Sequence, residues 1–79
     1  MKKEMAEYEK EKHAGLQGKI FVHKKYNAEM KVVEIGIAET CSKTNDFFVY
    51  CRLEGKLGKV TETLEYVLNN YRINQVTPD

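Results

Sequence analysis

The sequence lacks most of the features that mark secreted and membrane proteins. Its 79 residues hold two cysteines, one proline and no tryptophan, and two cysteines are too few for the disulfide framework of a small secreted domain. No apolar run approaches the roughly 20 residues that a membrane-spanning helix needs. The stretch from Met1 to Lys12 is charged and has no apolar segment of the kind found in signal peptides. We therefore expect a cytoplasmic protein without a membrane segment.

An excess of charge of one sign is also missing. Thirteen Lys and Arg face 12 Asp and Glu, which leaves a formal net charge of +1 at pH 7. This balance argues against a protein that coats DNA, because such binding depends on neutralising phosphates, but it leaves room for a local basic patch. The composition, 42% hydrophobic and 32% charged, is that of a globular protein. The length predicts a single domain over residues 1–79 with a thin core.

Motifs for catalysis and for cofactors are absent as well. The paired glycines stand in turn-forming contexts and match neither a phosphate loop nor a dinucleotide fingerprint. Four residues could ligate a soft metal, but no two of them have the spacing of a structural zinc site: His13, His23, Cys41 and Cys51. We expect Cys51 in the core and Cys41 in an exposed loop, where it could be oxidised. The sequence thus predicts no cofactor, no metal and no enzymatic activity.

Residue patterns divide the domain into a helical extension over residues 1–14, a sheet-plus-helix region over residues 19–71 and a tail over residues 72–79. The extension holds strong helix formers without Gly, Pro or β-branched residues. Gly15 and Gly18 are expected to end it.

In the central region, runs rich in β-formers predict strands at residues 19–26, 29–38 and 47–53. Gly36 is a candidate bulge or bend, and shorter strands are candidates at residues 59–60 and 73–76. An apolar face at helical spacing predicts a helix over residues 61–71, capped by Thr61. Strands joined by short loops pair antiparallel. The expected class is α+β, with a small antiparallel sheet of three to four strands, or a partly open barrel, carrying an N-terminal and a C-terminal helix.

Alternation of side chains across a strand separates two faces of this sheet. The purely apolar sets, together with the apolar face of the helix, are expected to form the core: Ile20, Val22, Val33, Ile35, Ile37, Phe47, Val49, Leu53, Leu64, Val67, Leu68 and Tyr71.

The opposite face would mix aromatic and cationic side chains, and it is the candidate binding site: Phe21, His23, Lys25, Phe48, Tyr50 and Arg52. Aromatic rings interleaved with cations can stack bases while neutralising phosphates. The same face could instead be covered, by the N-terminal helix or by a second subunit, or it could bind another protein. Of these three, the covered state is favoured.

Four short segments resemble a small, functionally uncharacterised family of SH3-like barrel domains from bacteria and phages. They are Phe21-Val22-His23-Lys24, the strand from Lys31 to Thr40, the strand and turn from Val49 to Gly55, and the stretch from Leu64 to Val67. The resemblance covers residues 18–71, about two thirds of the chain. It implies an SH3-like, partly open barrel and places little constraint on function. The final helix looks longer here than in that family, and the N-terminal helix lies outside the match.

These observations favour a non-catalytic protein-interaction module. A phage or mobile-element accessory protein that binds and modulates a host protein fits this size and balance of charge. The alternative is a small nucleic-acid-binding barrel that uses the aromatic and basic face. A thin core and an aromatic face also favour a homodimer over a monomer.

Overall fold

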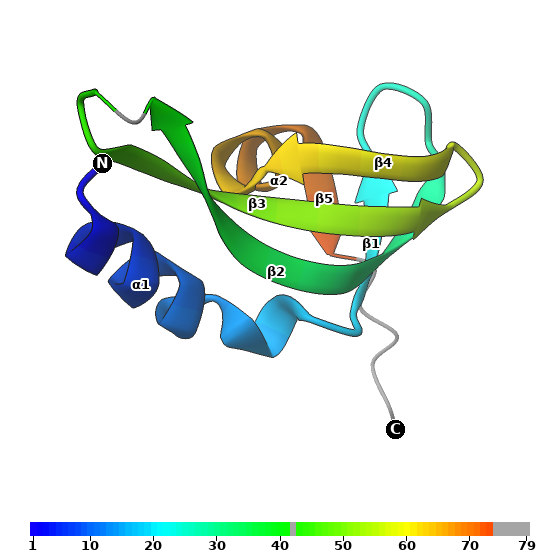
Figure 1. The fold of residues 1–79 in the computed structure, drawn as a ribbon. Helices are drawn as coiled ribbons and strands as arrows, with labels where there is room; N and C mark the ends of the chain where they lie inside the picture. The colour runs from blue at the N-terminus through cyan, green and yellow to red at the C-terminus, as the bar shows by residue number, and fades with distance from the viewer. Residues whose placement is uncertain (42, 74–79) are drawn as a thin grey trace.

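A computed structural model describes residues 1–41 and 43–73 (Figure 1). In chain order, its elements are α1 (Lys3–Lys12), a 3-10 turn (Ala14–Leu16), β1 (Ile20–His23), β2 (Glu29–Cys41), β3 (Asp46–Gly55), β4 (Gly58–Thr63), α2 (Leu64–Asn70) and β5 (Tyr71–Ile73).

All five strands belong to one antiparallel sheet with the order β4-β3-β2-β1-β5. The α+β class is therefore confirmed, and the sheet has five strands where the sequence predicted three to four. β5 is only three residues long, which is too short to stand out in a sequence. The rest of the candidate strand at residues 73–76 lies outside the described residues. Figure 1 shows β2 as a long, curved strand with α1 on one side and α2 behind β3 and β4.

A bulge in β2 decides which of its side chains face the core. Val32 pairs with Leu53 and Glu34 pairs with Arg52, so Val33 is an extra residue with no partner of its own in β3. An extra residue reverses the alternation. Before the bulge, the side chains of Met30 and Val32 are buried in the core, whereas after it the buried core side chain is that of Ile35. The expected bulge at Gly36 is wrong, because Gly36 pairs regularly with Tyr50.

The orientation of β1 follows from this register. Phe21 pairs with Met30, and both are buried in the main core cluster. The expectation that Ile20 would belong to the core is wrong, whereas the burial expected for Val22 is confirmed. Ile20 is 36% exposed, and Val22 is buried outside the main cluster, between Glu29 of β2 and Arg72 of β5.

The helix α2 begins three residues later than the sequence predicts. Its N-cap is Thr63, whose hydroxyl accepts a hydrogen bond from the Tyr66 backbone N–H at 3.0 Å, so Thr61 is not the cap. Leu64 and Val67 are buried against the sheet, but Leu68 is 46% exposed. The short helix can turn only a narrow face inward, which is why Leu68 does not join the predicted core.

The helix α1 packs on the sheet through a small side chain. Ala6 is fully buried in the core cluster, because only a small residue lets the helix backbone approach the strands closely. The apolar stripe of this helix points outward, and Met5 and Tyr8 are 58% and 61% exposed. No helix among the described residues is long and apolar enough to span a bilayer.

The core lies between the inner face of the sheet and the two helices. Its buried members are Ala6, Phe21, Met30, Val32, Ile35, Val49, Cys51, Leu53, Leu64, Val67 and Tyr71. The third strand behaves as its alternation predicts, since Val49, Cys51 and Leu53 point inward. Ile37 and Phe47 pack against this core while remaining partly exposed.

Candidate functional site

The six candidate site residues do not share one surface. Phe48, Tyr50 and Arg52 lie on the outer face of β3, where Phe48 and Tyr50 are half-buried and Arg52 is exposed. Phe21 and His23 point into the molecule and are 2% and 4% exposed. The sixth residue, Lys25, is exposed in the turn between β1 and β2. Phe21 and His23 point inward because of the way β1 pairs with β2 and β5. Lys25 lies outside the sheet because β1 ends at His23.

The outer face of β2 and β3 carries a polar network around Tyr50. The Tyr50 hydroxyl donates a hydrogen bond to Glu34 Oε1 at 3.0 Å, and Arg52 Nε lies 3.7 Å from the same oxygen. The hydrogen bond to Glu34 is the main reason that the pKa of Tyr50 is raised, since that bond needs the phenolic proton. We call Glu34, Phe48, Tyr50 and Arg52 the Tyr50 face.

Gly36 determines how Tyr50 lies on this face. The two residues are register partners, and a Cβ on Gly36 would collide with the Tyr50 ring, coming within 2.7 Å of Cε2. The absence of a side chain at Gly36 lets the ring lie across β2. Sequence reasoning singled out Gly36 but missed this role, because the role depends on the pairing of two strands.

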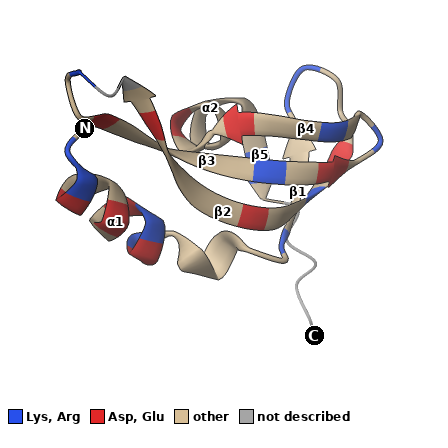
Figure 2. Cartoon of the chain, in the orientation of Figure 1, with Lys and Arg blue, Asp and Glu red and all other residues tan. Residues whose placement is uncertain are grey.

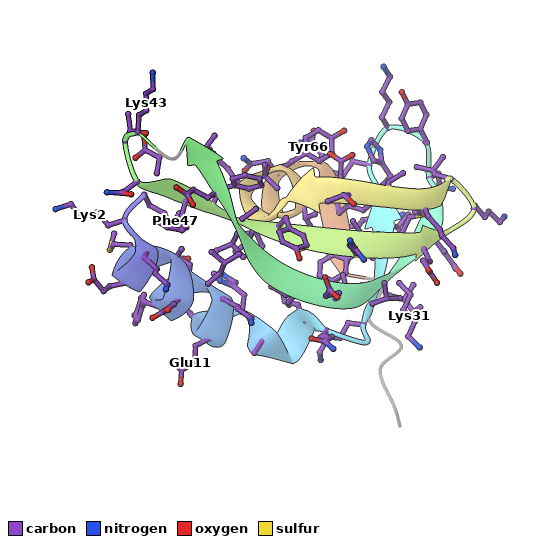
Figure 3. The ribbon with its side chains drawn as sticks, in the orientation of Figure 1. Lys2, Glu11, Lys31, Lys43, Phe47 and Tyr66 are labelled. Atoms are coloured by element: carbon purple, nitrogen blue, oxygen red, sulfur yellow. The ribbon has the colours of Figure 1, made fainter. Side chains whose placement is uncertain are left out.

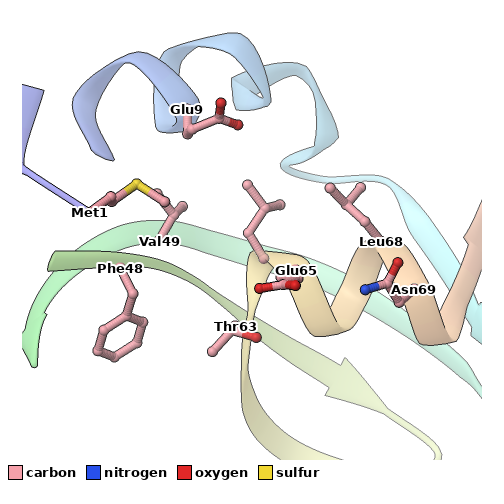
Figure 4. A pocket seen from close by; sticks show the side chains of 9 residues that line it. Met1, Glu9, Phe48, Val49, Thr63, Glu65, Leu68 and Asn69 are labelled. Atoms are coloured by element: carbon pink, nitrogen blue, oxygen red, sulfur yellow. The ribbon is translucent and has the colours of Figure 1, made fainter. Parts of the chain in front are cut away.

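A groove adjoins the Tyr50 face where β3 extends beyond the end of β4. Its volume is about 440 Å³, and Figure 4 shows it between α1, the β3 strand and α2. Phe48 and Thr63 line the groove and connect it with the outer face, since Thr63 is the β4 partner of Tyr50. The exposed side chain of Leu68 projects toward α1 in this view. The full lining is Met1, Glu9, Phe48, Val49, Thr63, Leu64, Glu65, Leu68 and Asn69.

His23 is a structural residue whose two ring nitrogens are both occupied. Nδ1 accepts hydrogen bonds from the backbone N–H groups of Lys25 and Tyr26 at 3.1 and 3.3 Å. Because a backbone N–H can only donate, the ring proton is on Nε2, which lies 3.1 Å from the Tyr66 hydroxyl and donates to it. Figure 3 labels Tyr66 on α2. His23 therefore ties the β1–β2 turn to α2.

No family model, curated protein or solved structure matches the chain. The proposed site therefore depends on the geometry of this chain alone.

The structure describes part of the set of residues that could ligate a metal or act as a nucleophile. Within residues 1–41 and 43–73, no three His, Cys, Asp or Glu side chains form a group that could hold a metal ion. Cys51 is fully buried, and burial raises the pKa of its thiol to about 11. Such a thiol is almost entirely protonated near neutral pH and is a poor nucleophile. The side chain of Cys41, which was expected to be exposed, lies outside the described part of the structure.

Proposed function

We propose that the protein is a non-catalytic interaction module that binds another protein through the Tyr50 face and the adjoining groove. The observation that carries this proposal is that the positive charge of Arg52 on this face is paired with a carboxylate. Arg52 and the Tyr50 hydroxyl share one carboxylate, that of Glu34. The face thus offers aromatic surface and fixed hydrogen-bonding groups rather than free positive charge.

This arrangement suits a protein partner better than a nucleic acid. Tyr and Arg are the side chains that most often dominate the energy of protein interfaces. Apolar surface lies beside them, since Phe48 lines both the face and the groove, and Leu68 is exposed in that groove. A phosphate approaching Arg52 would meet the Glu34 carboxylate at the same place, which reduces the attraction. Phe21 and His23 were expected on the nucleic-acid surface, but both are buried and cannot contribute to it.

The finer expectations about origin and architecture belong to the same proposal. We infer an SH3-like, partly open barrel; the strong curvature of the long strand β2, which bends the five-stranded sheet, supports this (Figure 1). A phage or mobile-element protein that binds a host factor remains the context in which we place the module. We propose no catalysis, in keeping with the buried Cys51 and the fully engaged ring of His23.

The proposal is tested by affinity capture with matched variants. Tagged wild-type protein and the Tyr50→Ala and Leu68→Lys variants are incubated with bacterial lysate, with and without nuclease, and bound proteins are identified by mass spectrometry. Tyr8→Ala is the control, because it removes an exposed tyrosine from α1, outside both the Tyr50 face and the groove. We expect one stoichiometric protein that survives nuclease and is retained by the control but lost from both face variants.

Circular dichroism establishes that each variant is folded. The absence of any stoichiometric protein after nuclease treatment, or a surviving partner that binds both face variants as well as the wild type, would contradict the proposal.

A further inference from the structure

A second aromatic surface lies at the β1–β2 turn, away from the Tyr50 face. Tyr26 is 58% exposed in this turn, and Tyr66 of α2 is 37% exposed. Both rings contact the buried His23 ring, with centroids 4.7 and 6.2 Å from it. Lys24 and Lys25 directly precede Tyr26 in the chain, and Arg72 of β5 donates a hydrogen bond to Asn27 in the same turn. We call Lys24, Lys25, Tyr26, Tyr66 and Arg72 the Tyr26 patch.

The turn that carries this patch is held rigidly from inside. His23 Nδ1 accepts the backbone N–H groups of both Lys25 and Tyr26. The Asn27 N–H donates to the His23 carbonyl at 2.8 Å, and Asn27 adopts a left-handed conformation with φ 52°, which Asn tolerates better than most residues. Tyr26 is therefore presented in a fixed position, so a ligand would not have to order the turn on binding.

In the part of the chain that the structure describes, the cations of the Tyr26 patch are not paired with carboxylates. Lys24 Nζ donates to the Asn69 carbonyl at 3.2 Å, and Arg72 Nη2 donates to Asn27 Oδ1 at 3.2 Å. Lys25 Nζ lies 5.4 Å from the centroid of the Tyr26 ring. All of these contacts are to neutral groups, and none of the three cations takes part in an ion pair among the described residues.

More positive charge lies close to the turn. The Lys56 N–H donates to the Glu29 carbonyl at 3.1 Å, which brings the β3–β4 turn beside the start of β2. Figure 2 shows basic residues at both hairpin turns on this end of the sheet and an acidic residue at the end of β3 beside them. The basic residues Lys24, Lys25, Lys56, Lys59 and Arg72 still outnumber Glu29 and Glu54 there, so this end attracts an anion more strongly than the net charge of the whole chain suggests.

We propose that the Tyr26 patch binds single-stranded nucleic acid. A base stacks on the exposed Tyr26 ring, and the phosphates on either side of it are contacted by Lys24, Lys25 and Arg72. Exposed aromatic rings beside unpaired cations are the combination that single-strand binding uses. A purely electrostatic ligand would use the cations and leave the two exposed tyrosines without a role. This site is separate from the Tyr50 face, and either can exist without the other.

The test is fluorescence anisotropy with a labelled oligothymidylate and its ribonucleotide counterpart. Tyr26→Ala is expected to weaken binding about tenfold, which is the loss of one stacked base. Three phosphate contacts predict a slope of log affinity against log salt of about −2, which should shrink to about −0.7 in the Lys24→Ala/Lys25→Ala variant.

Matched controls on α1 remove the same kinds of side chain from another surface. Tyr8→Ala and Lys3→Ala/Lys10→Ala should leave both affinity and salt slope unchanged. Failure of the wild type to bind either oligonucleotide at low salt would overturn the proposal, as would equal weakening in the α1 controls. Competition by inorganic polyphosphate or by an acidic peptide that is as effective as unlabelled oligonucleotide would also overturn it, because neither offers a base to stack.

Discussion

The Tyr50 face and the Tyr26 patch both place a tyrosine beside cationic side chains, yet they handle charge in opposite ways. At the Tyr50 face, a carboxylate in register with Arg52 neutralises the guanidinium and holds the tyrosine hydroxyl. At the Tyr26 patch, the cations contact carbonyl, amide and ring groups, so their charge remains available. The comparison indicates that aromatic residues next to Lys or Arg do not by themselves define a nucleic-acid site. The position of the nearest carboxylate matters as much.

The Tyr26 patch, unlike the Tyr50 face, is supported by the buried ring of His23. Removing this ring should lower the stability of the protein more than the other substitutions described below. His23→Ala deletes a buried ring and leaves three hydrogen-bonding groups without their partner. We expect the free energy of unfolding to fall by about 2–4 kcal/mol, measured by urea denaturation. His13→Ala is the control, because this second histidine, which follows the last residue of α1, is only partly buried, and its loss should cost less than about 1 kcal/mol. Equal losses in the two variants would refute the structural role of His23.

Cys51 can report whether disturbing the Tyr50 face opens the sheet below it. Its thiol lies on the inner side of β3 between Tyr50 and Arg52 in sequence, and burial raises its pKa from 9.0 to about 11. In a Cys41→Ser background, ionisation alone should slow thiol labelling by about a hundredfold relative to the unfolded chain. Tyr50→Ala should leave this slow rate nearly unchanged, whereas His23→Ala should raise it. Rapid labelling of the folded Cys41→Ser protein would show that the sheet is not closed over Cys51.

Gly36→Ala should disturb the Tyr50 face without affecting the Tyr26 patch. The added Cβ collides with the Tyr50 ring, which must move and give up its hydrogen bond to Glu34. We expect a loss of about 1 kcal/mol in stability and a shift of the Tyr50 ring resonances in NMR spectra, with Tyr26 unchanged. Gly15→Ala is the control, since nothing lies within 4 Å of a Cβ at that position. Unperturbed Tyr50 resonances in Gly36→Ala would contradict this packing.

The smallest effect is expected from Glu34→Gln, which alters charge and little else. The hydrogen bond to Glu34 raises the pKa of Tyr50 in the folded protein. The neutral phenol is thus favoured by folding, and the stability linked to it is present below pH 10.0 and lost as the pH rises above that value. In Glu34→Gln, the pKa of Tyr50 should fall toward its ordinary value, as followed by the NMR titration of the Tyr50 ring carbons. An unchanged titration would mean that Glu34 is not the cause.

The sequence was sufficient to predict which side chains of β3 face the core, because the side chains of this strand alternate between the two faces of the sheet without interruption. Val49, Cys51 and Leu53 face inward, and Phe48, Tyr50 and Arg52 face outward, as predicted. The sequence was insufficient to predict this for β1 and β2. Val33 is an extra residue in β2, so the side chains that precede it face the opposite way from what a regular alternation with those that follow it would give. Nothing in the composition of a run of Val and Ile identifies which member is the bulge. Phe21 was consequently assigned to the wrong face.

The sequence predicted the candidate site only in part, as it did the fold. Alternation identified Tyr50 and Arg52, but it could not supply Glu34 or Gly36, because their roles depend on the register between two strands. Tyr26 was missed for a different reason. It was placed inside a strand over residues 19–26, whereas β1 ends at His23 and leaves Tyr26 in the turn. The hydrogen bonds from this turn to the His23 side chain have no counterpart in a local sequence pattern.

The position of β1 between β2 and β5 has a consequence for how the chain folds. Phe21 pairs with Ile73, and His23 pairs with Tyr71, so strands near opposite ends of the sequence must meet. During synthesis, the outer edge of β1 stays open until the last strand has left the ribosome, while the β2–β3 and β3–β4 hairpins can already form from local contacts. Contacts of such long sequence separation are formed late and slow the folding of small domains. We therefore expect β5 to dock last, which would leave β1 and the core beneath it the part of the nascent chain most exposed to aggregation.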